Sequence, residues 1–599
     1  MDQRLPLRRP ATPGSFDAQP AHVEQWIAAL PVLNVGETTR LLFNALVEFN
    51  TLEMPTAQRM KSLELLRVPV RNITETLKKH YVGHSFPLAP KGRKVAELSK
   101  EMLNQLAIGY RIVVAEERDK PRFRRDKRLL ATAMHRALAC LGLVLLKAYQ
   151  VYAPYPPGVW REVHRLYEQA SERGLLEHAV RDAGEDGIAL TIEDAYKQIL
   201  LLALACPYRL RQGEVEQVFR ALENWSREAE LTDLVEAPNP GGLFIVNLAS
   251  DDPPSYLILR HTRYDRAHCR LLDTARLAET VRHAFTDRNQ GRAGPGVPSE
   301  TILRRLMLSW GVMPRRRYSR TEKAATAVVA MGLSATHYFI SGENTFSADS
   351  GDAEAPHYDA RATFTARETR ERENEVPDVW DLAETRRWRS DDNHRIRMVD
   401  FPAQPSKLAP KSPPPLETEP HPPEYHTHEW KMVDVSAGGY RLLWDSGENS
   451  EAEVGELVGI REASDPDAFH MGLGVVRWMK CAEGRGLELG VQMIAPGGVA
   501  VGTKKAGARE YLRSLILPEI RAIGQPATLI TPTLPYHVGD QVLVNSHGKE
   551  ARVELTKLVE NTGAFAQFQF RPLDSRASSS QGDSADGSNS GFDELWEQI

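Results

Sequence analysis

Cysteine is scarce in this chain of 599 residues. The four cysteines, Cys140, Cys206, Cys269 and Cys481, lie far apart and form no CxxC pair. That spacing excludes the common zinc knuckles and dithiol redox motifs, which need closely paired cysteines. It also provides no disulfide framework, so we expect the protein in a reducing compartment, the cytoplasm.

Long apolar runs and an excess of positive charge are missing as well. The most apolar stretch, residues 137–146, is ten residues long, whereas a helix needs about 18–20 residues to span a bilayer. We therefore expect a buried core helix there and no stable membrane insertion. No apolar segment follows the basic N-terminus, which argues against a secretory signal. A net charge of −5 disfavours a general nucleic-acid-binding surface.

Motifs for catalysis are not found either. No glycine-rich phosphate loop precedes a helix, and no GxSxG or Ser-His-Asp arrangement occurs. His421, His426 and His428 lie beside a proline-rich stretch but lack a fourth ligand and a stiff frame for a metal ion. We expect a protein that is not an enzyme and that uses no metal and no cofactor.

The length predicts three or four domains, and the pattern of the sequence changes along the chain. Residues 37–52 carry apolar residues at helical spacing, and residues 94–118 and 126–153 repeat that pattern. After a mobile N-terminus over 1–20, we therefore expect a helical domain over 21–232.

The next part of the chain is mixed. Strands at 243–249 and 256–261 and a helix at 275–285 predict a small αβ segment over 240–310. Residues 343–424 are poor in aliphatic residues, acidic overall and rich in proline at their end. We expect a disordered insertion there.

The rest of the chain is rich in β-strand patterns. Short apolar or alternating runs between turn residues occur from about 425 to 503 and again from 526 to 573. A helix is expected at 506–517, so that 504–573 is a helix plus a second small β unit, which we interpret as structural or as a dimer contact. The tail over 574–599 has an acidic, serine-rich composition that predicts disorder.

Two short motifs stand out as a pair. Residues 314–320 read PRRRYSR and contain Arg316 and Arg320 at an i, i+4 spacing, within a segment (301–323) of about +6 charge. Residues 434–440 read DVSAGGY, a DxSxxG pattern between two expected strands. Each motif alone has an ordinary explanation, a solvated charge run and an Asx-type turn respectively.

Together with the strands that follow, the motifs resemble the PilZ domain family. VGELVGI, LGVVRWM and LELGVQMI come after the DVSAGGY turn in the order typical of that family. The resemblance covers residues 314–342 and 428–496. It implies a six-stranded antiparallel β-barrel over 314–342 and 425–503 that binds the bacterial second messenger cyclic di-GMP. In this multidomain α+β chain, the barrel would be a receptor.

The chemistry of the residues fits that ligand. Arginine forms bidentate bonds to phosphate and to the O6/N7 edge of guanine, and it stacks on bases. We expect Arg316 and Arg320 to clamp phosphate and base, and Asp434, Ser436 and Gly439 to read guanine. Three further residues are less strongly indicated: Arg315, Arg317 and Gly438.

The spacing between the motifs departs from the family pattern. Here 113 residues separate Arg320 from Asp434, and we attribute the excess to the polar insertion. Loop-closure entropy grows only logarithmically with length, so a surface insertion is tolerated. The strand after the arginines is expected at 325–331, and residues 332–341 fit a strand or a helix.

Two other hypotheses compete with the receptor. The first is a scaffold whose barrel has lost its ligand and whose helical domain holds a protein partner. Whether the protein is a receptor or a scaffold, the sequence does not identify the protein partner of the helical domain. The second is nucleic-acid binding through local basic patches, such as residues 118–128. That run also suits anionic lipid, but we prefer a solvated loop between helices and expect no nucleic-acid partner.

Overall fold

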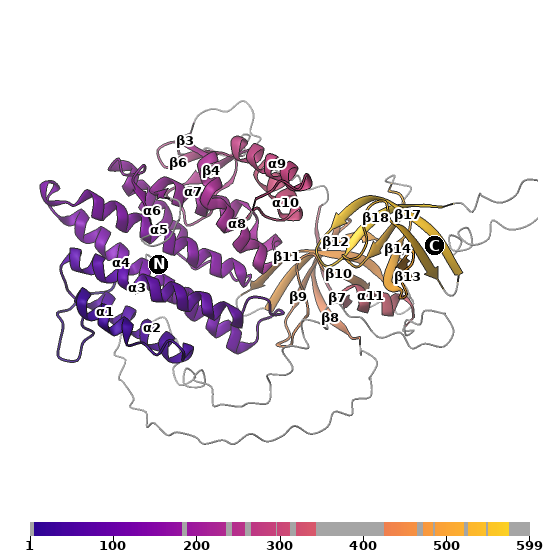
Figure 1. Cartoon of the computed structure of the whole chain (residues 1–599), viewed down its shortest axis with the longest axis horizontal. Coiled ribbons are helices and arrows are strands. Elements are labelled where there is room, and N and C mark those ends of the chain that lie inside the picture. Colours follow the sequence, from indigo (N-terminus) through magenta and orange to yellow (C-terminus); the bar gives the residue numbers. More distant parts are fainter. Residues whose placement is uncertain are drawn as a thin grey trace, which may run out of the picture. The chain divides into compact units, whose positions relative to one another are not determined.

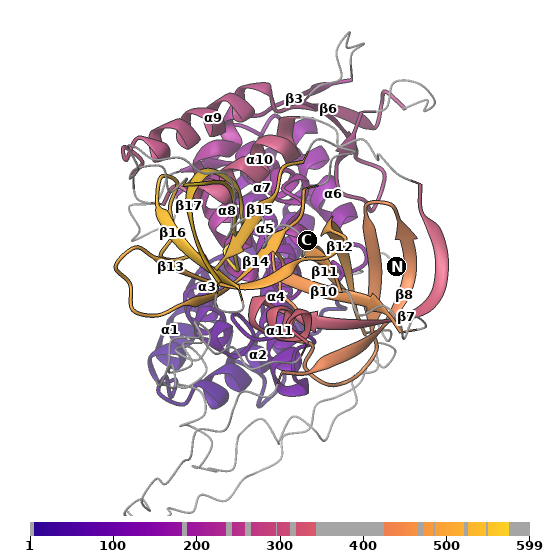
Figure 2. The same ribbon diagram turned by 90° about the vertical axis from the view of Figure 1, so that its right-hand side faces the viewer.

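We describe a computed structural model of the chain. It describes residues 5–181, 189–234, 242–257, 265–294, 296–311, 319–342, 425–463, 471–482, 486–519, 525–546 and 549–573. The predicted disordered segments over 343–424 and 574–599 lie outside these residues. Figure 1 labels the elements, and Figure 2 turns the same view by 90°.

The N-terminal part of the chain is helical, as the sequence predicts. Its α-helices are α1 (Pro20–Ala28), α2 (Val35–Thr51), α3 (Thr56–Leu77), α4 (Pro90–Asp119), α5 (Lys127–Gln150), α6 (Val159–Glu172), α7 (Ile192–Leu204) and α8 (Gln212–Trp225). Short 3-10 turns are η1 (Lys78–His80), η2 (Arg122–Arg124), η3 (Pro207–Arg209) and η4 (Ser226–Glu228), and a small ladder pairs β1 (Ala179–Val180) with β2 (Leu190–Thr191).

Helix α5 is the centre of this domain. Asp126 caps its N-terminus by accepting a hydrogen bond from the Leu129 amide at 3.0 Å. Among the described residues, α5 alone is long and apolar enough to cross a membrane, but 78% of its most apolar window is buried inside the protein. Its apolar residues belong to one large core with α2–α4 and α6–α8. The prediction of a buried core helix at 137–146 is confirmed.

The αβ segment has one four-stranded antiparallel sheet and two helices. The strands are β3 (Glu230–Asp233), β4 (Leu243–Asn247), β5 (Ser255–Tyr256) and β6 (Cys269–Asp273), in the order β3-β6-β4-β5. The helices are α9 (Ala275–Asn289) and α10 (Glu300–Gly311). Phe244, Leu272 and Trp310 join the core of the helical domain, so this segment packs on the helices.

The next unit is a closed six-stranded barrel. Its strands are β7 (Thr321–Met331), β8 (Thr427–Ser436), β9 (Gly439–Trp444), β10 (Leu457–Glu462), β11 (Gly472–Ala482) and β12 (Gly486–Ala495), in the order β10-β11-β12-β9-β8-β7. Every pairing is antiparallel. Alternate residues such as Trp430 and Met432 fill the interior. The six-stranded barrel implied by the resemblance is confirmed.

Strand β7 closes this barrel although the insertion separates it from the other five strands. It pairs with β8 on one side and with β10 on the other. Residues 332–341, which fit a strand or a helix, form a helix, α11 (Leu333–Ile340). Gly332 precedes α11 with a φ of +89°, a conformation that glycine adopts without strain.

The last unit is a second closed six-stranded barrel, larger than the small β unit that the sequence predicts. Its strands are β13 (Val499–Lys505), β14 (Leu512–Leu517), β15 (Thr528–Thr531), β16 (Gln541–Ser546), β17 (Lys549–Asn561) and β18 (Ala566–Pro572). The helix expected at 506–517 is wrong: residues 512–517 are a strand that pairs with β13. Residues 514–517 are all buried, so the run lacks the alternation that identifies a half-buried strand.

Buried contacts tie these units together. Phe86 and Tyr152 of the helical domain lie in the hydrophobic core of the first barrel, with their ring centroids 4.9 Å apart. The backbone carbonyl of Phe86 accepts a hydrogen bond from the Ser450 hydroxyl at 2.5 Å. A further apolar cluster joins residues of both barrels with α11. The first barrel is therefore packed against both of its neighbours.

Candidate ligand-binding site

The DxSxxG motif forms a tight hairpin turn between β8 and β9. Ser436 pairs with Gly439 across a two-residue turn. The Ser436 hydroxyl donates a hydrogen bond to the Gly439 carbonyl at 3.3 Å. Ser436 therefore stabilises the turn.

The backbone conformation and the space around position 439 require glycine. Its φ is +152°, and a Cβ atom built on it would lie 1.9 Å from the carbonyl oxygen of Val491 on β12. No side chain fits in that space. The neighbouring Gly438 accepts a hydrogen bond from the Met493 amide at 3.1 Å. The backbone at Gly439 is thus in close contact with strand β12.

Arg320 and Asp434 meet at the same end of the barrel. They are 114 positions apart in the chain, yet Arg320 Nη1 lies 3.3 Å from Asp434 Oδ1 and 3.4 Å from Oδ2. Pairing of β7 with β8 brings them together, because Thr321 stands opposite Val435. Arg320 is 44% exposed and Asp434 13%, so the arginine forms the outer wall of the site.

Arg441 completes this cluster, and the sequence analysis missed it. Arg441 faces Asp434 across the hairpin. Its Nη1 lies 3.7 Å from Asp434 Oδ2, and its Nη2 donates to Glu488 Oε2 on β12 at 2.8 Å. The hydrogen bond to Glu488 is the main cause of a raised pKa for Arg441. A two-residue turn fixes this pairing, so the turn itself was the signal that pointed to Arg441.

The predicted site residues thus gather at one hairpin, as far as they are described. Arg320, Asp434, Ser436, Gly438 and Gly439 lie within the described residues and adjoin one another. Arg315, Arg316 and Arg317 fall outside them. The site combines guanidinium groups, one carboxylate and a glycine turn.

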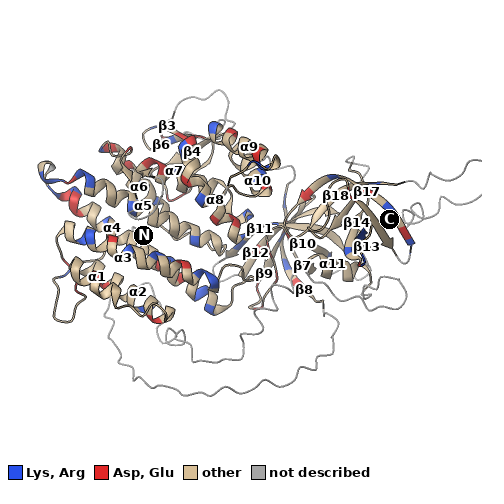
Figure 3. Cartoon of the chain, in the orientation of Figure 1, with Lys and Arg blue, Asp and Glu red and all other residues tan. Residues whose placement is uncertain are grey.

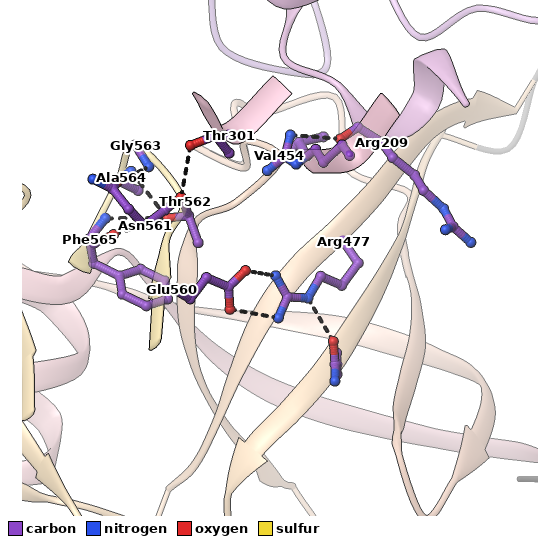
Figure 4. Close-up of polar contacts among 12 residues, drawn as sticks. Arg209, Thr301, Val454, Arg477, Glu560, Asn561, Thr562, Gly563, Ala564 and Phe565 are labelled. Atoms are coloured by element: carbon purple, nitrogen blue, oxygen red, sulfur yellow. Dashed lines mark hydrogen bonds and ion pairs between the residues drawn. The ribbon is translucent and has the colours of Figure 1, made fainter. Parts of the chain in front are cut away.

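Polar contacts continue from the turn into the second barrel. Gln492 stands opposite Gly439 on β12, and its side chain accepts from Arg477 Nε on β11 at 2.8 Å. Figure 4 shows the guanidinium of Arg477 forming a two-pronged ion pair with Glu560 on β17. The same figure shows the Thr301 hydroxyl of α10 bonded to the Asn561 carbonyl.

No metal centre stands out beside this site. Among the described residues, no group of three or more His, Cys, Asp or Glu side chains is arranged to hold a metal ion. His428 packs its ring against Trp444 at 5.3 Å, and His421 lies outside the described residues.

Fold and site together define a class of protein. A closed six-stranded antiparallel barrel with an arginine before its first strand and a DxSxxG turn between two later strands is a PilZ-type domain. In this chain it stands between a helical N-terminal domain and a second barrel.

Comparisons with known proteins identify the family. Three family models match consecutive parts of the chain: the cyclic-di-GMP receptor FimW N-terminal domain over 21–238, its middle PilZ domain over 243–499, and the FimW C-terminal β-barrel domain over 498–573. The cyclic-di-GMP receptor FimW of Pseudomonas aeruginosa is 34% identical over 571 residues, which covers 93% of this chain and 91% of that protein. The chain belongs to the FimW family. No solved structure matches it significantly.

Proposed function

We propose that this protein is a receptor for cyclic di-GMP and that the ligand binds at the β8–β9 turn of the first barrel. The observation that carries the proposal is the Arg320–Asp434 pair, which joins the two motifs despite the insertion between them. Its relative in Pseudomonas aeruginosa is named a receptor for the same ligand. We propose binding and signalling, and no catalysis.

The chemistry of the pair supports this ligand. A carboxylate accepts hydrogen bonds from the N1–H and N2–H₂ edge of guanine, and an arginine binds phosphate or the opposite edge. Arg320 neutralises Asp434 in the described structure. Guanine would replace Arg320 at Asp434, and the released guanidinium would turn to a phosphate. Arg441 would stay in place because Glu488 holds it.

Calorimetric titration of the full-length protein tests the proposal. Cyclic di-GMP should bind saturably and GTP should not. Arg320→Ala and Asp434→Ala should each weaken binding by about 10–100-fold, because each removes hydrogen bonds that involve a charged group. Arg304→Ala is the matched control, since Arg304 is an exposed arginine that pairs with Glu300 on α10.

The scaffold hypothesis makes the opposite prediction for the wild-type protein. If titration gives no heat and the ligand does not raise the melting temperature, the barrel is a scaffold without a ligand. If binding is retained in both variants at wild-type affinity, the ligand binds elsewhere and the site assignment fails.

We also propose a route by which binding reaches the rest of the chain. Gly439 pairs with Gln492, Gln492 bonds to Arg477, and Arg477 holds Glu560 of the second barrel. A ligand that shifts the turn would therefore change the contact between the two barrels. Such a switch requires different ligand affinities in the two arrangements.

A double-mutant cycle tests this route. Arg477→Ala and Glu560→Ala should each change the affinity for cyclic di-GMP although neither residue touches the turn. The two effects should be non-additive, because the residues form one ion pair. Wild-type affinity in both variants would refute the route while leaving the site itself untouched.

The output of the receptor is proposed to pass through the helical domain. That domain contacts the barrel core through Phe86 and Tyr152, so a moved barrel would alter its surface and its binding of a protein partner. A cytoplasmic location remains our proposal, and the four free cysteines are consistent with it. Homodimer formation is proposed for the second barrel, with light scattering as the test.

A further inference from the structure

The turn between α4 and α5 carries a concentration of positive charge that the receptor function does not use. Residues 118–128 contain seven Lys or Arg and two Asp, a net charge of +5 in a chain of −5. We call this segment, which includes the 3-10 turn η2, the basic tip (Figure 3). It joins the two long central helices of the helical domain.

The acidic residues of the tip are occupied by local contacts. Asp126 caps α5 through the Leu129 amide, and Asp119 pairs with Arg118 at 3.0 Å. Just before the tip, Glu117 bonds to Lys120 and to the Asp126 amide.

Several of the basic residues have no acidic partner. Within the described part of the chain, no carboxylate forms an ion pair with the tip residues Arg124, Lys127 or Arg128. All three are exposed. These charges face solvent with nothing of opposite sign to balance them.

An exposed aromatic residue sits in the middle of this charge. Phe123 is 83% exposed, and the guanidinium of Arg124 lies 5.5 Å from the centre of its ring. A second apolar side chain, Leu7, is 88% exposed. It precedes Arg8, whose Nε lies 3.6 Å from Glu116 Oε1 near the end of α4. Leu7 and Phe123 thus flank the same end of the helical domain.

We infer that the basic tip is a docking surface for an anionic lipid bilayer. Basic side chains are attracted to anionic headgroups, and apolar side chains between them enter the boundary between headgroups and acyl chains. An exposed aliphatic side chain, Leu7, in addition to the aromatic Phe123 suits lipid better than nucleic acid, because bases stack on aromatic rings and gain little from leucine. The protein would bind the membrane surface reversibly with this end of its helical domain.

Co-sedimentation of the full-length protein with lipid vesicles tests the inference. Vesicles of phosphatidylglycerol mixed with phosphatidylcholine should bind the protein at low salt, and vesicles of pure phosphatidylcholine should not. The triple variant R124Q/K127Q/R128Q should lower the partition coefficient by roughly 100-fold, about fivefold for each charge removed. Phe123→Ser should lower it by about tenfold, because an apolar side chain no longer leaves water.

Two variants outside the tip serve as controls. Leu33→Ser removes a 99% exposed leucine between α1 and α2, and Arg220→Gln removes a 68% exposed arginine on α8. Both should bind vesicles like the wild-type protein. The four changed positions in the tip and the two control positions are all exposed, so thermal melting should be unaffected in every variant, which confirms folding.

Three results would overturn the inference. Absence of binding to anionic vesicles at low salt would mean that the tip is only a solvated turn. Equal vesicle binding by the tip variants and the controls would assign the lipid contact to another surface. Binding to a single-stranded oligonucleotide that depends on the tip, without vesicle binding, would identify a nucleic-acid site instead.

Discussion

Replacing Gly439 by alanine should damage both the stability of the first barrel and ligand binding. The new Cβ would lie 1.9 Å from the Val491 carbonyl oxygen, whereas real Cβ contacts stay beyond 3.0 Å. Strands β9 and β12 would have to separate where Gly439 pairs with Gln492. The backbone would also keep an unfavourable φ of +152°.

The size of the effect follows from these two terms. Backbone strain of this kind costs about 1–3 kcal/mol and crowding a similar amount, so we expect a loss of about 2–6 kcal/mol. In a domain of ordinary size this lowers the melting temperature by about 5–15 °C. Cyclic di-GMP affinity should fall as well, because Ser436 and Asp434 lie on the same hairpin.

Gly447→Ala provides the control. Gly447 lies in the exposed loop after β9, and a Cβ atom there would meet nothing within 4 Å. Its variant should melt and bind like the wild type. A wild-type melting temperature for Gly439→Ala would refute the conclusion that β12 leaves no room for a side chain at position 439. If Gly439→Ala loses affinity for cyclic di-GMP but keeps the wild-type melting temperature, the glycine is needed to make room for the ligand and not for strand β12.

Three further predictions concern Phe86, His337 and Ser436. Phe86→Ala should destabilise the contact between helical domain and barrel by about 3–5 kcal/mol in denaturant unfolding, because the ring is 2% exposed within the barrel core; a loss below about 1 kcal/mol would contradict that packing. Burial lowers the pKa of His337 to about 4. Between pH 6.5 and 4 this histidine therefore binds a proton in the unfolded chain but not in the folded chain. The free energy of unfolding should fall as the pH drops through this window. His337→Gln should flatten that fall in melting temperature, and an unchanged pH profile would exclude His337 as its source. Ser436→Ala should cost only about 0.5–1.5 kcal/mol, the value of one hydrogen bond, as measured by thermal melting.

The helical domain and most strands were predictable because their signals are local. The 3.6-residue apolar spacing of residues 37–52 predicts α2, and alternation predicts strands such as β16. Residues 506–517 show where this reasoning fails. Leu512, Leu515 and Ile516 fit a helical spacing, but pairing of β14 with β13 and β15 decides the conformation. The spacing of apolar residues within 512–517 does not show that these neighbouring strands pair with it.

The site was predictable in its two motifs and not in the contacts between them. A hairpin turn is a local feature, so the turn at DVSAGGY could be predicted from the sequence, whereas the expectation that Asp434 and Ser436 bind ligand also needed the arginine motif and the strands that follow. The role of Gly439 could not, because its close neighbour Val491 is 52 positions away. The Arg477–Glu560 ion pair joins the two barrels, and no sequence motif in β11 or β17 predicts it.

The pairing of β7 explains how the site tolerates the long insertion between its two motifs. Strand β7 is held by ladders with β8 and β10 over most of its length, and the barrel core includes Val329 and Met331 from the same strand. These contacts offset the loop-closure entropy of the insertion, which grows only as the logarithm of its length. Arg320 is therefore fixed by the start of β7, one residue before its pairing begins, and not by the segment that follows. The position of the two motifs depends on the register of β7 against β8, so shortening the insertion should leave the Arg320–Asp434 pair intact.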